Sequence, residues 1–421
     1  MTAAEPHVVI LGGGFGGLHA AKALKRAPVR VTLADRRNHH LFQPLLYQVA
    51  TAALNPADIA SPIRSILRDQ KNTTVILAEA ASIDVPGKRV VLTDGELPYD
   101  YLIVATGATH SYFGHPEWSA PAPGLKTIED ALEIRRRVLL AYEEAERETD
   151  AALRREWLTF VIVGGGATGV EMAGALAEIS RQALFRDFRH IDPRSARVIL
   201  VEGSDRVLPG FELKLSQSAR EQLERLGVDV WTGTRVTNID DRGVSLGDER
   251  IAARTVVWAA GVQASPVVRS LGAPLDRAGR VLVTPNLTVP GHDEISVIGD
   301  LAALEQDGKP VPGVSPAAMQ EGRHAARNIV RTIRGEPLQA FRYFDKGSFA
   351  TIGRGAAVGA LRGGLSLTGF IAWVAWMAIH IFFLIGFRHR VLVMLQWAYS
   401  YLTFRRGARL ITGGPDVHGP H

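Results

Sequence analysis

The 421-residue chain contains no cysteine. Disulfides, cysteine-ligated zinc, iron–sulfur clusters and thiol nucleophiles are therefore excluded as functions of its own side chains. A redox enzyme that passes electrons through a pair of its own cysteines is excluded with them. No metal site is expected.

Acidic residues are missing from the C-terminal part of the chain. Residues 346–415 contain eight Lys or Arg and no Asp or Glu, while the whole chain has a net charge of +5, which leaves −3 for the remainder. A basic, aromatic-rich segment favours an anionic membrane surface over nucleic acid as its partner. The N-terminus has no basic region of a secretory signal, and its first apolar run leads directly into glycines, so we expect a cytoplasmic start.

Only one long apolar run is present, Leu365–Phe387, whose single titratable side chain is His380. Its 23 residues are enough to span a bilayer, which takes ~20 apolar residues. A buried core helix and a transmembrane span are both possible, but clustered aromatics followed by Arg388 and Arg390 favour a pair of helices lying in the membrane interface. We therefore predict a membrane-attachment region at residues 346–412 and a disordered tail at 413–421.

Glycine is abundant, and the first of two glycine loops follows the apolar run Val8–Leu11. Residues Gly12–Gly17 match GxGxxG, in which the first Gly allows a tight turn, the second a close approach to pyrophosphate and the third close helix packing. A helix is predicted over 19–26 and a strand over 29–34. Asp35 ends that strand, where a carboxylate can accept from ribose hydroxyls.

The second glycine loop, Gly164–Gly169, follows the predicted strand 160–163 and precedes a predicted helix over 170–179. Glu202 ends the next strand, 198–201. Its carboxylate would accept from a ribose 2′-OH and repel a 2′-phosphate, which favours NADH over NADPH, although Arg206 nearby weakens that preference. Glu171 is either an acid favoured in the first turn of a helix or a residue near the reacting rings.

Two copies of one strand–loop–helix–strand unit indicate an α/β protein with two Rossmann-like dinucleotide-binding domains. We predict a discontinuous FAD-binding domain, residues 1–115 and 275–345, with an NADH-binding domain, 116–274, inserted in it. A charged helix at 130–155 is predicted to link them. The membrane-attachment region follows as a helical C-terminal segment.

The chain resembles the type II NADH:quinone oxidoreductases of the two-dinucleotide flavoprotein superfamily. The glycine loops and Ala105-Thr106-Gly107 are typical of the whole superfamily, whereas the Phe42–Ala50 segment and the C-terminal region are more specific to the family. Further matching segments are His40–Leu41, Trp258–Gly261, Ile298–Asp300 and Ala317–Gln320.

The resemblance implies which residues would meet the two dinucleotides. Those implied for FAD are Gly12, Gly14, Phe15, Gly16, Gly17, Asp35, Arg36, Gln43, Pro44, Leu45, Ala81, Ala105, Thr106, Gly107, Asp300, Ala317 and Ala318. Those implied for NADH are Gly164, Gly166, Thr168, Gly169, Glu202, Ala260 and Gly261.

Three residues are implied to act in catalysis: Glu171 near the nicotinamide, and Gln320 and Lys346 on the quinone side. The family's quinone segment commonly has two glutamines, but here Pro316 occupies the place of the first. Proline offers no side-chain donor or acceptor, so the group that hydrogen-bonds the quinone is left open. Without the resemblance, Lys346 would be interpreted as a solvated surface residue, which a single lysine more often is.

The implied function is transfer of a hydride from NADH to non-covalently bound FAD, followed by transfer of two electrons to a membrane quinone of a respiratory chain, without proton pumping. The implied location is the cytoplasmic face of the cell membrane, as a peripheral protein and a possible homodimer. The alternatives are a soluble NAD(P)H:ferredoxin-like reductase and a flavin-bound redox sensor or scaffold.

Overall fold

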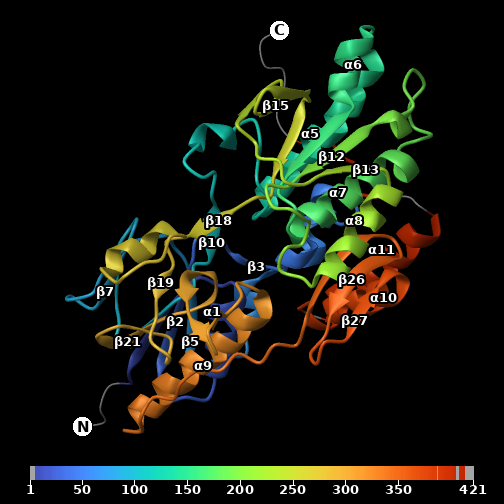
Figure 1. The fold of residues 1–421 in the computed structure, drawn as a ribbon. Coiled ribbons are helices and arrows are strands. Elements are labelled where there is room, and N and C mark those ends of the chain that lie inside the picture. The colour runs from blue at the N-terminus through green and yellow to red at the C-terminus, as the bar shows by residue number, and fades with distance from the viewer. Residues whose placement is uncertain (1–4, 386, 404–406, 413–421) are drawn as a thin grey trace. The chain divides into compact units, whose positions relative to one another are not determined.

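The computed structural model describes residues 5–385, 387–403 and 407–412, which form two compact units (Figure 1). Unit 1 consists of the segments 1–41, 60–109 and 262–346, and unit 2 of 42–59, 110–261 and 347–421. The division groups 42–59 and the C-terminal segment with the second glycine loop, whereas the sequence-based boundaries separate them. The predicted disordered tail, 413–421, lies outside the described residues.

Unit 1 is built on a six-stranded sheet in the order β20-β21-β9-β1-β2-β5, in which only β20 is antiparallel. Apolar β-branched residues form its central strands because both faces are covered. The strands are β1 (His7–Leu11), β2 (Arg30–Asp35), β5 (Thr73–Leu77), β9 (Tyr101–Val104), β20 (Thr288–Val289) and β21 (His292–Val297).

Two helices, α1 (Phe15–Ala23) and α9 (Ser315–Ile333), pack side by side in unit 1 (Figure 1). Their close approach depends on glycine, since a Cβ on Gly322 would lie 2.1 Å from the Gly16 carbonyl oxygen. The remaining elements of this part are β3 (His39–Leu41), β4 (Ala60–Pro62), α4 (Ile63–Leu67), β6 (Ala80–Asp84), β7 (Arg89–Leu92), β8 (Glu96–Pro98), β10 (Ala108–His110), β18 (Val262–Ala264), η5 (Pro266–Leu271), β19 (Val281–Leu282), η6 (Gly299–Leu301), β22 (Ala302–Ala303), β23 (Glu305–Gln306) and β24 (Lys309–Pro310).

Unit 2 contains a four-stranded parallel sheet in the order β13-β12-β11-β17. Its elements before the C-terminal segment are η1 (Gln43–Leu45), α2 (Leu46–Ala50), α3 (Pro56–Ile59), η2 (Pro116–Ser119), α5 (Ile128–Arg147), α6 (Ala151–Trp157), β11 (Thr159–Val163), α7 (Ala167–Glu178), η3 (Ile179–Ala183), η4 (Pro193–Ser195), β12 (Arg197–Val201), α8 (Leu213–Arg225), β13 (Val228–Trp231), β14 (Asn238–Asp240), β15 (Gly243–Leu246), β16 (Glu249–Ala252) and β17 (Thr255–Trp258).

The helix predicted over 130–155 is two helices, α5 and α6. Glu148 adopts an extended backbone after α5, and the Asp150 side chain accepts hydrogen bonds from the backbone N–H groups of Ala152 and Leu153. A carboxylate at this position caps a new helix and so ends the continuity of the old one.

The C-terminal segment forms an antiparallel sheet, β25 (Ser348–Gly353), β26 (Ala356–Ala360) and β27 (Ser366–Thr368), followed by α10 (Gly369–Phe383) and α11 (Phe387–Thr403). Strand β25 packs against α7, where a Cβ on Gly174 would lie 1.6 Å from the Ile352 carbonyl oxygen. The apolar run 365–387 is therefore divided between a strand and two helices. Within the described residues, no helix combines the length and apolar character needed to cross a membrane.

Candidate dinucleotide sites and an acidic cavity

The first glycine loop joins β1 to α1 and leaves its outer side open. Gly12 has a φ of +99°, and Cβ atoms on Gly12 and Gly17 would lie 2.4 Å from the Ala105 carbonyl oxygen and 1.9 Å from the Gly12 carbonyl oxygen, respectively. A Cβ on Gly14, by contrast, would meet nothing within 4 Å. Gly14 is the N-cap of α1 and supplies no capping side chain, so the first N–H groups of the helix are available to an anion.

Asp35 closes this loop from the end of β2. Its Oδ2 accepts from the Gly13 N–H at 2.5 Å and its Oδ1 from the Arg37 N–H at 2.7 Å. Arg36 forms an ion pair with Glu79, with 3.7 Å between Nη1 and Oε1, and both side chains are more than half exposed. The carboxylate thus holds the loop, and each oxygen keeps a further lone pair for a ribose hydroxyl.

Three other residues implied for FAD within unit 1 are Thr106 and Gly107, which follow the carboxyl end of β9, and Ala81, which lies in the separate β6-β7-β8 sheet. Thr106 follows β9, and its hydroxyl oxygen is buried with no hydrogen-bond partner among the described residues. Because buried hydroxyls are rarely left unpaired, Thr106 is suited to a ligand that supplies the missing partner. Gly107 adopts a φ of +70°. Ala81 lies at a β-bulge in β6, where the register with β7 shifts between Ala80 and Ser82.

Asp300 lies in the 3₁₀ turn η6 directly after β21, close to the start of α9. A Cβ on Gly299 would lie 3.5 Å from the Ala318 Cβ, and a Cβ on Gly16 would lie 3.4 Å from the Ala318 carbonyl oxygen. Ala317 and Ala318 are buried in the first turn of α9. The residues implied for FAD from the ends of β1, β2, β9 and β21, together with those from α9, therefore belong to one edge of the unit 1 sheet.

Glu321 is a buried acid on α9 that the sequence pattern does not identify. It is 3% exposed and accepts a hydrogen bond from the Gly299 N–H at 2.5 Å. Burial raises the pKa of Glu321 to about 7, and the charge of Asp300 contributes in the same direction, while the Gly299 bond opposes it. A carboxyl that titrates near neutral pH therefore fixes the Gly299–Asp300 turn.

The second glycine loop, in unit 2, repeats the geometry of the first. Gly164 has a φ of +109°, and a Cβ on Gly169 would lie 1.8 Å from the Gly164 carbonyl oxygen, while Gly166 is open and forms the N-cap of α7. Glu202 accepts from the Gly165 N–H at 2.5 Å and from the Ser204 N–H at 2.6 Å. The duplication inferred from sequence therefore extends to the bonding of the two acids.

The remaining residues implied for NADH surround this loop. Thr168 lies in the first turn of α7, and Ala260 follows β17, where a Cβ on Gly164 would lie 2.6 Å from the Ala260 Cα. The Gly261 carbonyl accepts from the Ser111 N–H at 3.1 Å. The Arg206 guanidinium donates to the Pro209 carbonyl at 3.1 Å, so it is partly engaged with the backbone.

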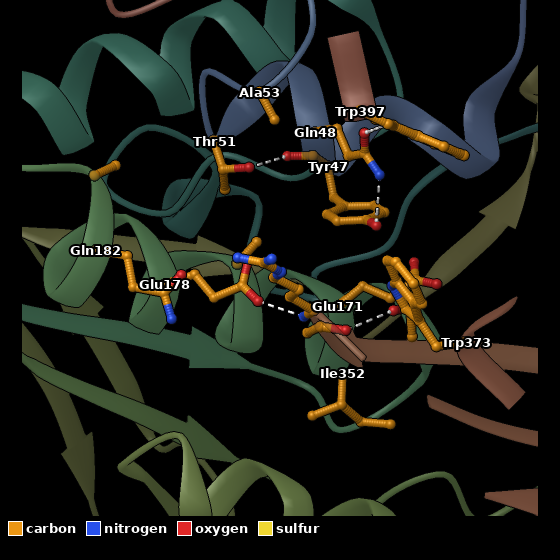
Figure 2. Close-up of a pocket in the computed structure, with 15 residues that line it drawn as sticks. Tyr47, Gln48, Thr51, Ala53, Glu171, Glu178, Gln182, Ile352, Trp373 and Trp397 are labelled. Carbon is orange, nitrogen blue, oxygen red and sulfur yellow. Dashed lines mark hydrogen bonds between the residues drawn. The ribbon is translucent and has the colours of Figure 1, made fainter. Parts of the chain in front are cut away.

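A cavity of about 690 Å³, part of it open to solvent, lies inside unit 2 beside one face of α7 (Figure 2). Glu171, Ala175, Glu178 and Gln182 line it at helical spacing, facing Tyr47, Gln48 and Thr51. Burial raises the pKa of Glu171 to about 8, opposed by a hydrogen bond from the Thr351 N–H. Glu171 thus holds its proton at neutral pH, as a group facing the cavity.

A hydrogen-bonded chain connects this cavity to α11. The Trp397 indole N–H donates to Gln48 Oε1 at 2.8 Å, and Gln48 Nε2 donates to the Tyr47 hydroxyl at 2.9 Å (Figure 2). Trp397 also stacks on Trp376 of α10, with 5.5 Å between ring centroids. The Phe42–Ala50 segment, which the resemblance singled out, is therefore anchored by the C-terminal helices.

Gln43, Pro44 and Leu45, which the resemblance implies for FAD, belong to unit 2, whereas Gln320 and Lys346, implied on the quinone side, belong to unit 1. Gln43 to Leu45 form η1 in unit 2, where Gln43 Nε2 donates to the Lys126 carbonyl at 3.4 Å. In unit 1 the Gln320 amide bonds the backbone of Phe344 twice, each at 3.0 Å, and Lys346 is exposed. Pro316 lies in the first turn of α9, where a helix needs no backbone N–H donor.

Within the described residues, no group of three or more His, Asp or Glu side chains is placed to hold a metal ion. The groups brought together are the main-chain N–H groups of two glycine loops, which are suited to bind phosphates, and the half-buried carboxyls of Asp35 and Glu202, which are suited to bind ribose.

Comparisons with known proteins agree with this architecture. Residues 6–322 match the family model of the pyridine nucleotide-disulphide oxidoreductases, and residues 346–406 match the NDH2 C-terminal domain. The chain is 46% identical to the type II NADH:quinone oxidoreductase Ndh of Mycobacterium tuberculosis, covering 96% of this chain and 90% of that protein. A second protein of that organism, NdhA, is 45% identical over 96% of this chain and 89% of its own length.

Among solved structures, NDH2 of Plasmodium falciparum in complex with NADH superposes with a TM-score of 0.87 at 20% identity, covering 96% of this chain and 99% of that one. The sulfide:quinone oxidoreductase of Aquifex aeolicus superposes with a TM-score of 0.74 at 22% identity, covering 92% of each chain. Both likenesses concern the fold. Taken with the sequence identities and the duplicated loops, they show that this chain belongs to the type II NADH:quinone oxidoreductase family.

Proposed function

We propose that this chain oxidises NADH and reduces a quinone with the help of bound FAD. The observation that carries the proposal is the presence of two glycine loops with matching geometry, one in each unit. Each loop of this kind is suited to one dinucleotide, so two loops are suited to a flavin and a nicotinamide dinucleotide. The name borne by the 46%-identical relative states the same activity.

FAD would be held by the first loop and the strand ends around it. Gly14 and the first turn of α1 would face its pyrophosphate, Asp35 a ribose, and Thr106 would gain the hydrogen-bond partner that its buried hydroxyl lacks. When bound, FAD would supply the redox chemistry, the acceptance of a hydride and the donation of two electrons, which the side chains of the protein lack. The protein's contribution is to bind, to orient and to exclude water.

NADH would occupy the second loop. Glu202 is suited to accept from the 2′-OH of the adenosine ribose and would repel a 2′-phosphate at the same place. The backbone contact of Arg206 with Pro209 reduces its availability to a 2′-phosphate. We therefore infer that NADH is preferred over NADPH.

Glu171 is proposed to hold a proton in the cavity of unit 2. Reduction of a quinone to a quinol consumes protons, and a carboxyl with a pKa of about 8 is protonated at neutral pH. Gln320 and Lys346 are proposed to act on the quinone side. The two hydrogen bonds between the Gln320 amide and the Phe344 backbone fix the orientation of that amide.

The C-terminal helices are proposed to attach the enzyme to the cytoplasmic face of the cell membrane. Large apolar side chains are exposed on both helices, among them Phe370 at 65%, Ile371 at 68% and Leu395 at 62%. Such surfaces are stabilised by contact with lipid. We further propose a homodimer, a peripheral mode of attachment and electron transfer without proton pumping.

Steady-state turnover tests the proposed activity. Purified holoenzyme in detergent is mixed with NADH or NADPH and a soluble quinone, and both the reduced nicotinamide and the quinone are followed. We expect one quinone reduced per NADH oxidised and much slower oxidation of NADPH. Failure to reduce any quinone while FAD is bound would contradict the proposal, and equal rates with both nucleotides would contradict the role of Glu202.

A further inference from the structure

We propose that His40 is a positioning residue for FAD, whose imidazole fixes the Gly13–Gly14 peptide so that the Gly14 N–H faces the pyrophosphate. The inference rests on the proposed function in one respect, the binding of FAD at the first glycine loop. His40 belongs to β3, which lies outside the strand–loop–helix–strand motif itself.

His40 is buried beneath the loop, at 2% exposure. Its Nδ1 lies 2.9 Å from the Gly13 carbonyl oxygen, and its ring meets the Phe15 ring edge-on, with 4.9 Å between centroids. A carbonyl oxygen only accepts, so Nδ1 carries the proton. Burial lowers the pKa of His40 to about 4, which keeps the imidazole neutral at neutral pH and its Nε2 unprotonated.

Both sides of Gly13 are therefore fixed by side chains. Asp35 accepts from its N–H at 2.5 Å, and His40 donates to its carbonyl. The carbonyl of Gly13 and the N–H of Gly14 belong to one trans peptide and point in opposite directions. Because His40 draws the carbonyl into the buried interior, the Gly14 N–H is turned outward, on the side where Gly14 is exposed.

The second loop meets the same requirement with a different atom. There the Gly165 N–H is held by Glu202, and the Gly165 carbonyl accepts from the Leu208 backbone N–H at 2.7 Å. Leu208 is buried in a left-handed conformation, with a φ of +49°, which is unusual for leucine. In both loops, therefore, the carbonyl of the second glycine, Gly13 or Gly165, accepts a hydrogen bond, although the donor differs. This indicates that the loop conformation itself requires a donor at that carbonyl.

Loss of the His40 donor would leave the Gly13 carbonyl buried without a partner. The peptide could then rotate in the FAD-free protein, and binding would have to restore its orientation. Preorganisation of this kind contributes directly to affinity. From the penalty for an unsatisfied buried acceptor, we expect about a tenfold loss in FAD affinity.

Three variants of the holoenzyme separate this role from general destabilisation. His40→Leu removes the donor, and His40→Asn retains an N–H donor at the topological position of Nδ1. His7→Leu is the matched control, because His7 is also a buried histidine of unit 1 but bonds Thr32, at 2.8 Å, rather than the loop. The FAD dissociation constant is obtained from flavin fluorescence at equilibrium across a dilution series of the holoenzyme, and thermal midpoints are measured over a range of FAD concentrations.

We expect His40→Leu to bind FAD about tenfold more weakly, with His40→Asn within about twofold of the wild type and His7→Leu unchanged in FAD affinity. NADH binding should be unaffected in all three variants. An unchanged FAD dissociation constant in His40→Leu, or equal weakening in His40→Asn and His40→Leu, would overturn the inference. A wild-type protein that binds no FAD would instead overturn the proposed function.

The protonation state of His40 gives an independent readout. Nitrogen-15 NMR of selectively labelled histidine, assigned with the His40→Asn variant, should show a neutral ring protonated at Nδ1. A ring protonated at Nε2 would rule out donation to the Gly13 carbonyl and with it the positioning role.

Discussion

Replacing Glu171 by Gln should reduce the dependence of stability on pH. Burial raises the pKa of Glu171 from an ordinary value of 4.5 to about 8. Between these pH values the folded protein retains a proton that the unfolded chain releases. The stability associated with the protonated carboxyl is fully present below pH 4.5 and is lost as the pH rises towards 8. Gln is neutral throughout and can still accept from the Thr351 N–H.

The size of the effect follows from the linkage relation. Each pH unit within this window changes the free energy of unfolding by at most ~1.4 kcal/mol, so the upper limit between pH 4.5 and pH 7 is about 3 kcal/mol. Glu171 keeps part of its surface in contact with the cavity, and solvent there screens the charge. About half the limit, ~1.5 kcal/mol, is therefore expected, which corresponds to about 2–4 °C in the thermal midpoint.

The assay compares thermal midpoints of wild type and Glu171→Gln from pH 5 to pH 9 at saturating FAD. The advantage of the variant should be small at pH 5, grow through pH 7 and level off above pH 8. Glu321→Gln is the internal comparison: burial raises the pKa of Glu321 to about 7, so its curve should level off about one pH unit lower. A Glu171→Gln advantage that is constant across this range, or that falls with pH, would refute the reasoning.

Three further predictions follow from packing and hydrogen bonding. In Gly17→Ala the new Cβ would lie 1.9 Å from the Gly12 carbonyl oxygen, and in Gly169→Ala it would lie 1.8 Å from the Gly164 carbonyl oxygen. Gly17→Ala should therefore lose FAD, as measured by flavin absorbance, whereas Gly169→Ala should lose only affinity for NADH, as measured by NADH titration. Equal loss of both ligands in either variant would contradict separate sites. Gly174→Ala, with its Cβ 1.6 Å from the Ile352 carbonyl oxygen, should force α7 away from β25 and lower stability by about 3 kcal/mol, seen as a lower thermal midpoint. Trp397→Phe should cost about 1–3 kcal/mol by leaving Gln48 Oε1 unbonded, whereas Trp376→Phe, whose indole nitrogen has no partner among the described residues, should cost less by the same measurement.

The duplicated loops could be predicted from sequence because every determinant is local. The tight turn, the close approach and the helix start lie within six residues of one another, and the acid follows at the next strand end. The structure places the predicted strands within one residue of their expected bounds, for example His7–Leu11 for the run Val8–Leu11. The helices begin earlier than expected, at Phe15 and Ala167, because the last three residues of each glycine loop form the first turn of the helix.

The supporting residues could not be predicted, since their contacts depend on how distant segments meet. His40 reaches Gly13 from 27 residues away, and Trp397 reaches Gln48 from 349 residues away. Glu321 follows Gln320 directly, yet nothing in the local pattern distinguishes an acid bonded to the Gly299 N–H from a solvated one. The pair of helices predicted at the C-terminus is present as α10 and α11, but the short strand β27 at the start of the apolar run could not be predicted, because hydropathy does not show where a strand ends and a helix begins.

Asp35 at the end of β2 and Glu202 after β12 show that a glycine-loop motif depends on hydrogen bonds that its sequence pattern does not reveal. Asp35 and Glu202 were assigned to ribose, yet each already holds the N–H of its loop's second glycine. A carboxylate that bonds the loop before any ligand arrives loses little entropy when a ribose hydroxyl joins it, because its orientation is already fixed. The same logic applies to the opposite side of that glycine, where an imidazole in one loop and a backbone N–H in the other hold the carbonyl. Since the phosphate-facing N–H groups belong to the backbone, their direction has to be set by the groups that hydrogen-bond the peptides behind them.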